Sequence, residues 1–488
     1  MRKALFALGL GLGVIVSGAA IAGGGIAPAV GAVMGIVLVG AVAAVGMSTE
    51  RLAWLAACLL VVTIQWNGIR VAGGAFGNVF MVLAFGAMVT HAVLGRRPVS
   101  APPALMLAGL AFLLAALLAM IFPAGSGLND QANIQLSSRL AAPVYLTHRS
   151  DVLALITFEL SFLVVPLVLI AAGSTAGRCR RLMDLWTCGA VVNAFVGLTD
   201  TLGIIHLSPY PLSSGTRSSA LTVHPNYLAL GASMAIPTAM VWIGRSPRWT
   251  LAGLAAVTTL LGGVYASGSR AGAVAAVVAV GVTAVAIPRL RRGTLLVLPV
   301  VGMLGIAVLL FTSTGSHILH QVRLGGSGPV DLTIQGSNFQ RHQAAHVGLA
   351  QFRAHPVAGV GFSVIADAHN IYLELLASGG LIALVAFLTF LGGLGDAIRR
   401  ALTGAQRPEV LAGTISVAVW LANGAADNQL ADKYLYVVPG LLFAMARVAR
   451  RATVTGPARS AAPSAQPAEH AAPPLAAEAG PARVPVPA

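Results

Sequence analysis

The chain has 488 residues, of which 57% are hydrophobic and only 9% are charged. Soluble domains carry about 25% charged residues, so this composition excludes a soluble globular enzyme and a largely disordered chain. The net charge is +15, from 30 basic and 15 acidic residues. A nucleic-acid-binding protein can have this balance, but arginines in the cytoplasmic loops of a multispan protein explain it more simply. We therefore expect membrane lipids, and no nucleic acid, as partners.

Apolar runs follow one another along most of the chain, and each is a candidate membrane span. They predict an all-α polytopic membrane protein with about 12–14 transmembrane helices. The first run follows Met1-Arg2-Lys3 as in a signal peptide, but a second run comes at once, so we expect a retained span. The runs lie at roughly 4–22, 28–46, 52–65, 78–94, 104–122, 152–172, 183–205, 225–243, 250–266, 271–287, 294–312, 371–394, 409–425 and 434–448.

The basic residues predict the orientation of these spans. When the N-terminus is placed inside and the spans alternate, 21 of the 30 Lys and Arg residues fall on the cytoplasmic side and 9 fall outside, as the positive-inside rule requires. The predicted outer loops are 123–151, 206–224 and a long loop near 313–370. Nine of the 11 histidines also fall outside. A candidate active face therefore points away from the cytoplasm.

Two arginines lie on the predicted outer side, where the orientation rule does not explain them. Arg217 lies in a Ser- and Gly-rich stretch just before a span that opens at His224-Pro225-Asn226. Arg270 lies in the short turn 267–272 between two apolar runs, so it must be near the membrane surface, where ionisable groups are costly and functional by default. A guanidinium suits a diphosphate because it stays charged and bonds two oxygens at once. The alternative is that these side chains reach up to lipid headgroups.

A second group of candidate functional residues lies where the longest predicted outer loop meets the next span. Asp367 is predicted to cap the span that follows, which places His369 and Asn370 in its first helical turn. The partial positive charge of a helix N-terminus disfavours imidazolium, and a neutral imidazole is the form that a general base needs. Glu374 falls one turn below Asn370, on the same face. The alternative for His369 is an interfacial capping residue.

The stretch from about 213 to 395 resembles the O-antigen ligase and O-antigen polymerase superfamily of multispan glycosyltransferases. One departure is Ala271, where family members often have glycine. Four motifs in order carry the resemblance: Arg217 ahead of His224-Pro225-Asn226, the Ser269-Arg270 turn, His355-Pro356 with Gly359 and Gly361, and His369-Asn370 followed by Gly379-Gly380. The His355 motif is itself interpreted as a loop-shaping turn. We expect N-terminal transmembrane helices at 1–205, a ligase- or polymerase-like catalytic region at 206–450, and a disordered Pro- and Ala-rich cytoplasmic tail at 456–488.

The resemblance implies an enzyme of the bacterial cytoplasmic (inner) membrane with an extracytoplasmic active face. Such proteins move a glycan from undecaprenyl diphosphate to an acceptor hydroxyl, which lies on lipid A-core in ligases and on another lipid-linked repeat unit in polymerases. The product is a cell-envelope polysaccharide such as lipopolysaccharide or exopolysaccharide. The implied chemistry is inverting, without cofactor or metal, and the outer loops show no Asp-x-Asp pair.

The resemblance also assigns roles to residues. Arg217 and Arg270 map onto the family's diphosphate-binding arginines, His369 maps onto its proposed base, and Arg341 is a weaker candidate for the same pocket. Five residues are expected to support them: His224, Asn226, Ser269, Asn370 and Glu374.

Transport is the main alternative, as a flippase of lipid-linked sugars or an exporter of small solutes. A transporter should show ionisable groups near the bilayer midplane and paired broken helices in two related halves. In this sequence Glu159 and Asp200 are the only acidic or basic residues that fall more than four positions inside an apolar run, and no internal repeat is evident. A membrane scaffold would not need so long an outer loop, because long loops are usually functional or disordered.

Overall fold

The computed structural model describes residues 48–71, 74–95, 101–122, 155–209, 217–291, 329–362, 369–404, 406–427 and 429–454. The predicted spans at 4–22, 28–46 and 294–312, the loop 123–151 and the tail 456–488 lie outside these residues. The chain divides into two units, Met1–Arg450 and Arg451–Ala488. The packing described below belongs to the first unit.

The described residues are almost entirely helical, which confirms the all-α prediction. Seven of their helical segments are long and apolar enough to cross a membrane, and α12 is a shorter apolar helix, so this is a multi-pass membrane protein. The helices are α3 (Thr49–Thr63), α4 (Phe76–Gly95), α5 (Pro103–Ile121), the π-helix η1 (Leu160–Val164), α8 (Val165–Ala172), α9 (Ala176–Thr201), α10 (Pro225–Ile243), α11 (Pro247–Ser267), α12 (Arg270–Ala286), α15 (Pro329–Ala354), α16 (Ile371–Ala401), α17 (Arg407–Asn423), the 3₁₀ turn η2 (Lys433–Tyr436) and α18 (Val437–Val454). Two short strands, β1 (Arg70–Val71) and β2 (Gly74–Ala75), pair antiparallel. Helix α15 occupies much of the region predicted as the outer loop 313–370.

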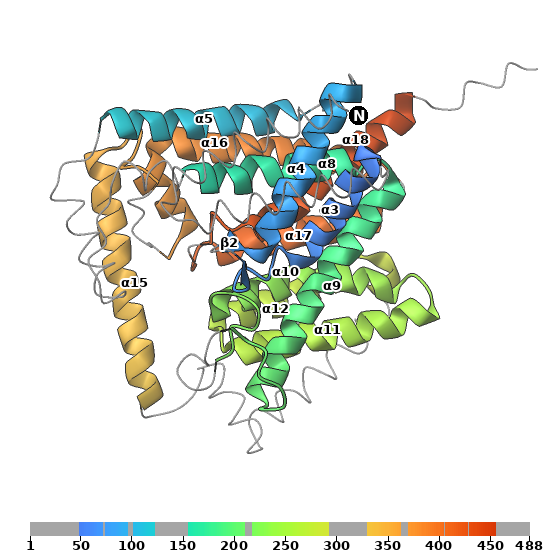
Figure 1. Cartoon of the computed structure of the whole chain (residues 1–488). Helices are drawn as coiled ribbons and strands as arrows, with labels where there is room; N and C mark the ends of the chain where they lie inside the picture. Colours follow the sequence, from blue (N-terminus) through green and yellow to red (C-terminus); the bar gives the residue numbers. More distant parts are fainter. Residues whose placement is uncertain are drawn as a thin grey trace, which may run out of the picture. The chain divides into compact units, whose positions relative to one another are not determined.

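Helix α10 is at the centre of the packing. It contacts α9, α11, α12 and α17. Of its apolar 18-residue stretch, 83% is buried inside the protein, more than in any other candidate span of the described residues. Figure 1 shows α10 between α17 and α12. Its sequence is rich in Ala, Gly and Ser, which let neighbouring helices approach closely. The ends of these helices therefore have fixed positions relative to one another.

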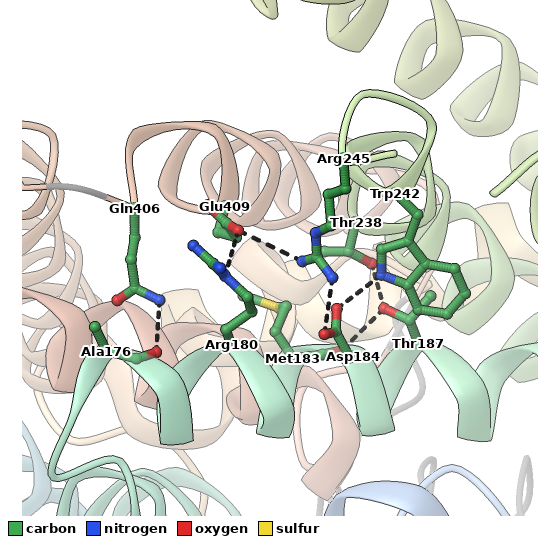
Figure 2. Close-up of polar contacts among 10 residues, drawn as sticks. All are labelled: Ala176, Arg180, Met183, Asp184, Thr187, Thr238, Trp242, Arg245, Gln406 and Glu409. Carbon is green, nitrogen blue, oxygen red and sulfur yellow. Dashed lines mark hydrogen bonds and ion pairs between the residues drawn. The ribbon is translucent and has the colours of Figure 1, made fainter. Parts of the chain in front are cut away.

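A network of ion pairs joins one end of this bundle (Figure 2). Arg245, after the last turn of α10, contacts Asp184 of α9 at 2.9 Å and Glu409 of α17 at 3.4 Å. Arg180 contacts the same Glu409 at 2.9 Å, and the indole of Trp242 donates to Asp184 at 2.7 Å. Buried carboxylates need such partners. Because Arg180 and Arg245 belong to the predicted cytoplasmic set, this is the predicted inner end.

Helix α16 is broken at Gly380, whose φ of 61° and ψ of −155° are not helical. The loop that follows α15 fills the break. Four backbone hydrogen bonds of 2.8–3.2 Å join the loop to the helix: from Leu381 to Pro356, from Ile382 to Val357, from Val360 to Ala377 and from Gly361 to Ser378. Backbone groups freed inside a membrane protein need partners of this kind. The His355-Pro356-to-Gly361 motif therefore shapes a loop, as predicted, and the loop holds a helix break that the sequence did not predict.

Close packing against the loop explains why the break has a glycine at position 380, and it leads to a prediction about stability. A Cβ on Gly380 would lie 2.3 Å from the Val357 carbonyl oxygen, and the left-handed backbone adds strain. We expect Gly380→Ala to lower the free energy of unfolding by at least about 2 kcal/mol, measured as a lower melting temperature in detergent. Gly392, in the same helix, has nothing within 4 Å of an added Cβ. Gly392→Ala should therefore not be destabilising, and equal losses in both variants would contradict this account.

Candidate active site at the outer helix ends

The predicted site residues lie at the opposite end of the bundle from the Arg245 network. Arg217 leads into α10, Arg270 is the first residue of α12, and His369 precedes α16. Helix α12 packs on α10 through a hydrogen bond from Ser233 to the Gly272 carbonyl, at 3.1 Å. Helix α17 packs on both α10 and α12. One end of a single bundle therefore carries all three positions.

Arg217 bridges the ends of two helices. Its Nε donates to the Ser267 carbonyl at the end of α11, at 2.8 Å, and its Nη2 donates to Asn226 Oδ1 at the start of α10, at 3.1 Å. Ser267 is only three residues before Arg270, so the Arg217 side chain contacts the turn that leads to Arg270. The predicted supporting role of Asn226 has a geometric basis here, because Asn226 fixes the direction of the guanidinium.

The segment after Arg217 is not a surface loop. Residues 218–222 are all buried, and their backbone is bonded to distant parts of the chain. Leu221 N donates to Asn193 Oδ1 of α9 at 3.0 Å, and Val223 N donates to Asn67 Oδ1 at 3.1 Å. Ala220, in the middle, has a left-handed φ of 50°. Non-helical backbone is tolerated in a membrane protein when protein surrounds it. Because these hydrogen bonds hold the segment, they also fix the backbone next to Arg217.

Arg270 lies half-buried at the positive end of α12. Ser269 is the N-cap of this helix, and its Oγ accepts a hydrogen bond from Gly272 N at 3.2 Å. Gly268 makes the turn possible with a left-handed φ of 58°. The predicted support from Ser269 is thus local. Ser269 caps α12, so that Arg270 is the first residue of this helix.

The start of α16 corrects one prediction. Asn370, and not Asp367, is the N-cap: its Oδ1 accepts from Tyr372 N at 3.0 Å and from Leu373 N at 3.1 Å. His369 therefore precedes the helix instead of lying in its first turn, and Asp367 lies outside the described residues. A short polar amide next to the first helical residue satisfies two backbone donors of the first turn.

His369 itself has a left-handed backbone, with a φ of 49°. Among the described residues other than glycine, only Ala220 and His369 have positive φ, and they flank the candidate site. Such strain persists where the surroundings over-determine the structure, and it clusters at active sites. The surroundings here are the bonds from Ile371 N to the Gly424 carbonyl (2.8 Å) and from Asn370 Nδ2 to the Ala425 carbonyl (3.2 Å).

The remaining predicted residues differ in how closely they join this end. His224 is the N-cap of α10, and its Nδ1 accepts from Asn226 N at 3.2 Å. Glu374 is buried in the first turn of α16, and its backbone N donates to the Asn370 carbonyl at 2.9 Å. Arg341 lies in α15, which packs against α16. Its Nε is buried and has no hydrogen-bond partner among the described residues, and no described contact joins it to Arg217.

Three helix N-termini point to this end of the bundle, each capped by a predicted supporting residue: His224 on α10, Ser269 on α12 and Asn370 on α16. A helix N-terminus carries about half a positive charge and favours anions. Two arginines and three positive helix ends together make an environment that would stabilise a multiply charged anion.

Sequence reasoning missed a polar cluster in the 424–432 segment. Asp427 is buried and accepts from Gln429 Nε2 at 2.6 Å. Asp432 is hydrogen-bonded by Asn67, and burial raises the pKa of its carboxyl to about 7, although the Lys433 ammonium acts in the opposite direction. These residues are far from Arg217 in sequence, but Asn67 connects both segments. A pair of acidic residues between two apolar runs was the only sequence signal for them.

The fold and this end of the bundle define a multi-pass α-helical membrane protein in which Arg270 follows the turn between two membrane helices and Arg217 donates a hydrogen bond to that turn. Residues 254–388 match the family model described as O-antigen ligase, which confirms the resemblance to the O-antigen ligase and polymerase superfamily. The match contains Arg270, Arg341 and His369, whereas Arg217 lies ahead of it. It supports an O-antigen ligase-type function, a glycosyltransferase-like enzyme, and lipid-linked glycans and membrane lipids as partners. No curated protein matches the chain.

Proposed function

We propose that the protein transfers a glycan from undecaprenyl diphosphate to an acceptor hydroxyl at the outer face of the bacterial cytoplasmic membrane. The residues 206–450 would form the catalytic region, with Arg217 and Arg270 on the diphosphate and Arg341 as a further candidate. The observation that carries the proposal is the hydrogen bond from Arg217 to the turn that precedes Arg270, at the starts of α10 and α12, where the helix N-termini add positive charge.

The chemistry follows from where charge develops. As the bond between the glycan and the diphosphate breaks, negative charge grows on the leaving oxygens, and the arginines stabilise it more in the transition state than in the ground state. The acceptor hydroxyl loses a proton as it attacks, and His369 takes it. A single displacement inverts the anomeric centre. The two arginines supply the positive charge that a metal ion supplies in other transferases, so activity should survive EDTA.

The proposal requires the Arg217 end of the bundle to face away from the cytoplasm. The 21-to-9 division of basic residues predicts this orientation. We expect single cysteines introduced near 217 and 430 to be labelled from outside in whole cells, and cysteines near 247 and 402 to be labelled only after permeabilisation. Labelling of the site near 247 from outside would invert the orientation and remove the extracytoplasmic assignment.

A gene deletion would separate the activities that this site can support. Surface glycan with one repeat unit and no longer chains would indicate a polymerase. Complete chains that remain on the carrier lipid would indicate a ligase. Purified protein in nanodiscs, given the undecaprenyl-diphosphate donor and the acceptor, should then form a linkage of inverted anomeric configuration, which NMR of the product determines.

Transport of lipid-linked sugars or small solutes stays as the alternative. The break in α16 is a feature that transporters share. In this protein, however, the loop 356–361 occupies the break with backbone hydrogen bonds, so these groups are not presented to a substrate. Unchanged glycan chains in the deletion strain, together with a lost solute phenotype, would favour transport.

A further inference from the structure

Asp200 is a buried carboxylate at the outer end of α9, within a predicted membrane span. It is 4% exposed. Its Oδ2 accepts a hydrogen bond from Ser218 Oγ at 2.7 Å, and its Oδ1 contacts His206 Nδ1 at 3.0 Å. A carboxylate in such a place is costly and calls for a function. None of the roles described so far uses it.

Ser218 connects Asp200 to the arginine of the site. It follows Arg217 directly, and its own backbone N donates to the Ala266 carbonyl at 3.0 Å, one residue before the carbonyl that Arg217 Nε contacts. Ser218 Oγ also accepts from Ala220 N at 3.0 Å. The Asp200–Ser218 bond therefore fixes the backbone directly after the point where the Arg217 side chain leaves the chain.

The strained backbone shows that these bonds determine the conformation. Ala220 is completely buried with a φ of 50°, which a non-glycine residue adopts only when its surroundings impose it. Ser218 holds the segment on one side of Ala220, and Asn193 and Asn67 hold it on the other. Without Asp200 the hydroxyl of Ser218 would lose its hydrogen-bond acceptor, and the residue next to Arg217 would lose its side-chain anchor to α9.

We propose that Asp200 is a positioning residue that, through Ser218, aims the Arg217 guanidinium at the diphosphate of the lipid-linked donor. This inference rests on the proposed function and adds to it a contribution from α9, outside the segment 254–388. Asp200 does not touch the substrate. It acts by removing conformational freedom from the arginine before the donor binds. The guanidinium then needs no rearrangement when it stabilises the diphosphate.

The test is the affinity of the full-length protein in nanodiscs for undecaprenyl diphosphate. We expect Arg217→Ala to weaken binding at least tenfold, and Asp200→Ala and Ser218→Ala each to weaken it by roughly threefold to tenfold. Asp200→Asn, which retains an oxygen acceptor for Ser218, should stay within about threefold of the wild type. Ser218→Ala keeps the inference testable if Asp200→Ala does not fold.

A double-mutant cycle distinguishes positioning from general stability. If Asp200 acts through Arg217, Asp200→Ala should weaken binding no further in the Arg217→Ala background. The matched control is Asp184→Asn at the inner end, which removes a half-buried carboxylate partner of Arg245 and should lower the melting temperature without changing the affinity. Unchanged affinity in both Asp200→Ala and Ser218→Ala, with Arg217→Ala impaired, would overturn the positioning role alone. Unchanged affinity in Arg217→Ala would overturn the proposed diphosphate site itself.

Discussion

Arg270→Ala should leave the protein folded in the membrane and lower glycan transfer by roughly 10²–10³-fold. The guanidinium stands at the first residue of α12, half-buried beside the positive end of the helix. In such a place a charge contributes more than it would in water, because the surroundings cannot rearrange to replace it. Folding should be spared because Ser269 still caps the helix in the variant.

Arg270→Lys should recover little of the lost activity. A lysine keeps the charge but is a point donor, whereas the guanidinium binds two oxygens of a phosphate in a fixed geometry. The measurement is transfer from the undecaprenyl-diphosphate donor by purified protein in nanodiscs, with and without EDTA. Arg248→Ala, which removes an exposed arginine at the inner end of α11, is the control and should be active. Wild-type transfer by Arg270→Ala would remove this residue from the diphosphate site.

The class of protein, which the structure confirms, and the side of the site, which stays a prediction, could both be predicted from the sequence because both depend on local patterns. Apolar runs predict spans, and Arg217 and Arg270 stand out because they contradict the distribution of the other arginines. The structure adds that Arg217 contacts the Ser267 carbonyl, in the turn before Arg270, at 2.8 Å. That contact joins residues 50 positions apart, and no local pattern predicts it.

The parts that sequence reasoning missed all depend on distant partners. Residues 218–222 are polar enough to be predicted as a loop, yet they are buried because Asn193 and Asp200 of α9 accept hydrogen bonds from them. The break at Gly380 lies inside an apolar run that is typical of one continuous span. It is possible only because residues 356–361 supply the missing partners. The cap at Asn370 was assigned to Asp367 because both are good capping residues, and only the backbone decides between them.

His369→Gln should bind undecaprenyl diphosphate as the wild type does and lower turnover by roughly 10²–10⁴-fold. Glutamine can donate and accept hydrogen bonds, but it cannot take a proton from the acceptor hydroxyl. Binding should persist because the arginines, and not His369, hold the diphosphate. His369→Asn is a useful second variant, because asparagine tolerates the left-handed backbone that His369 adopts, with a φ of 49°.

The capping explanation makes the opposite prediction, and Asn370 provides the matched control. Asn370 accepts from both Tyr372 N and Leu373 N, so Asn370→Ala should lower the free energy of unfolding by about 1 kcal/mol. The His369 variants should keep the melting temperature of the wild type, because the cap of α16 does not depend on them. Donor binding, turnover and melting temperature are measured for each variant in nanodiscs. Turnover near the wild-type rate in His369→Gln would exclude proton transfer by His369 and leave the site with its arginines alone, whereas a loss confined to turnover identifies the imidazole as the group that takes the proton.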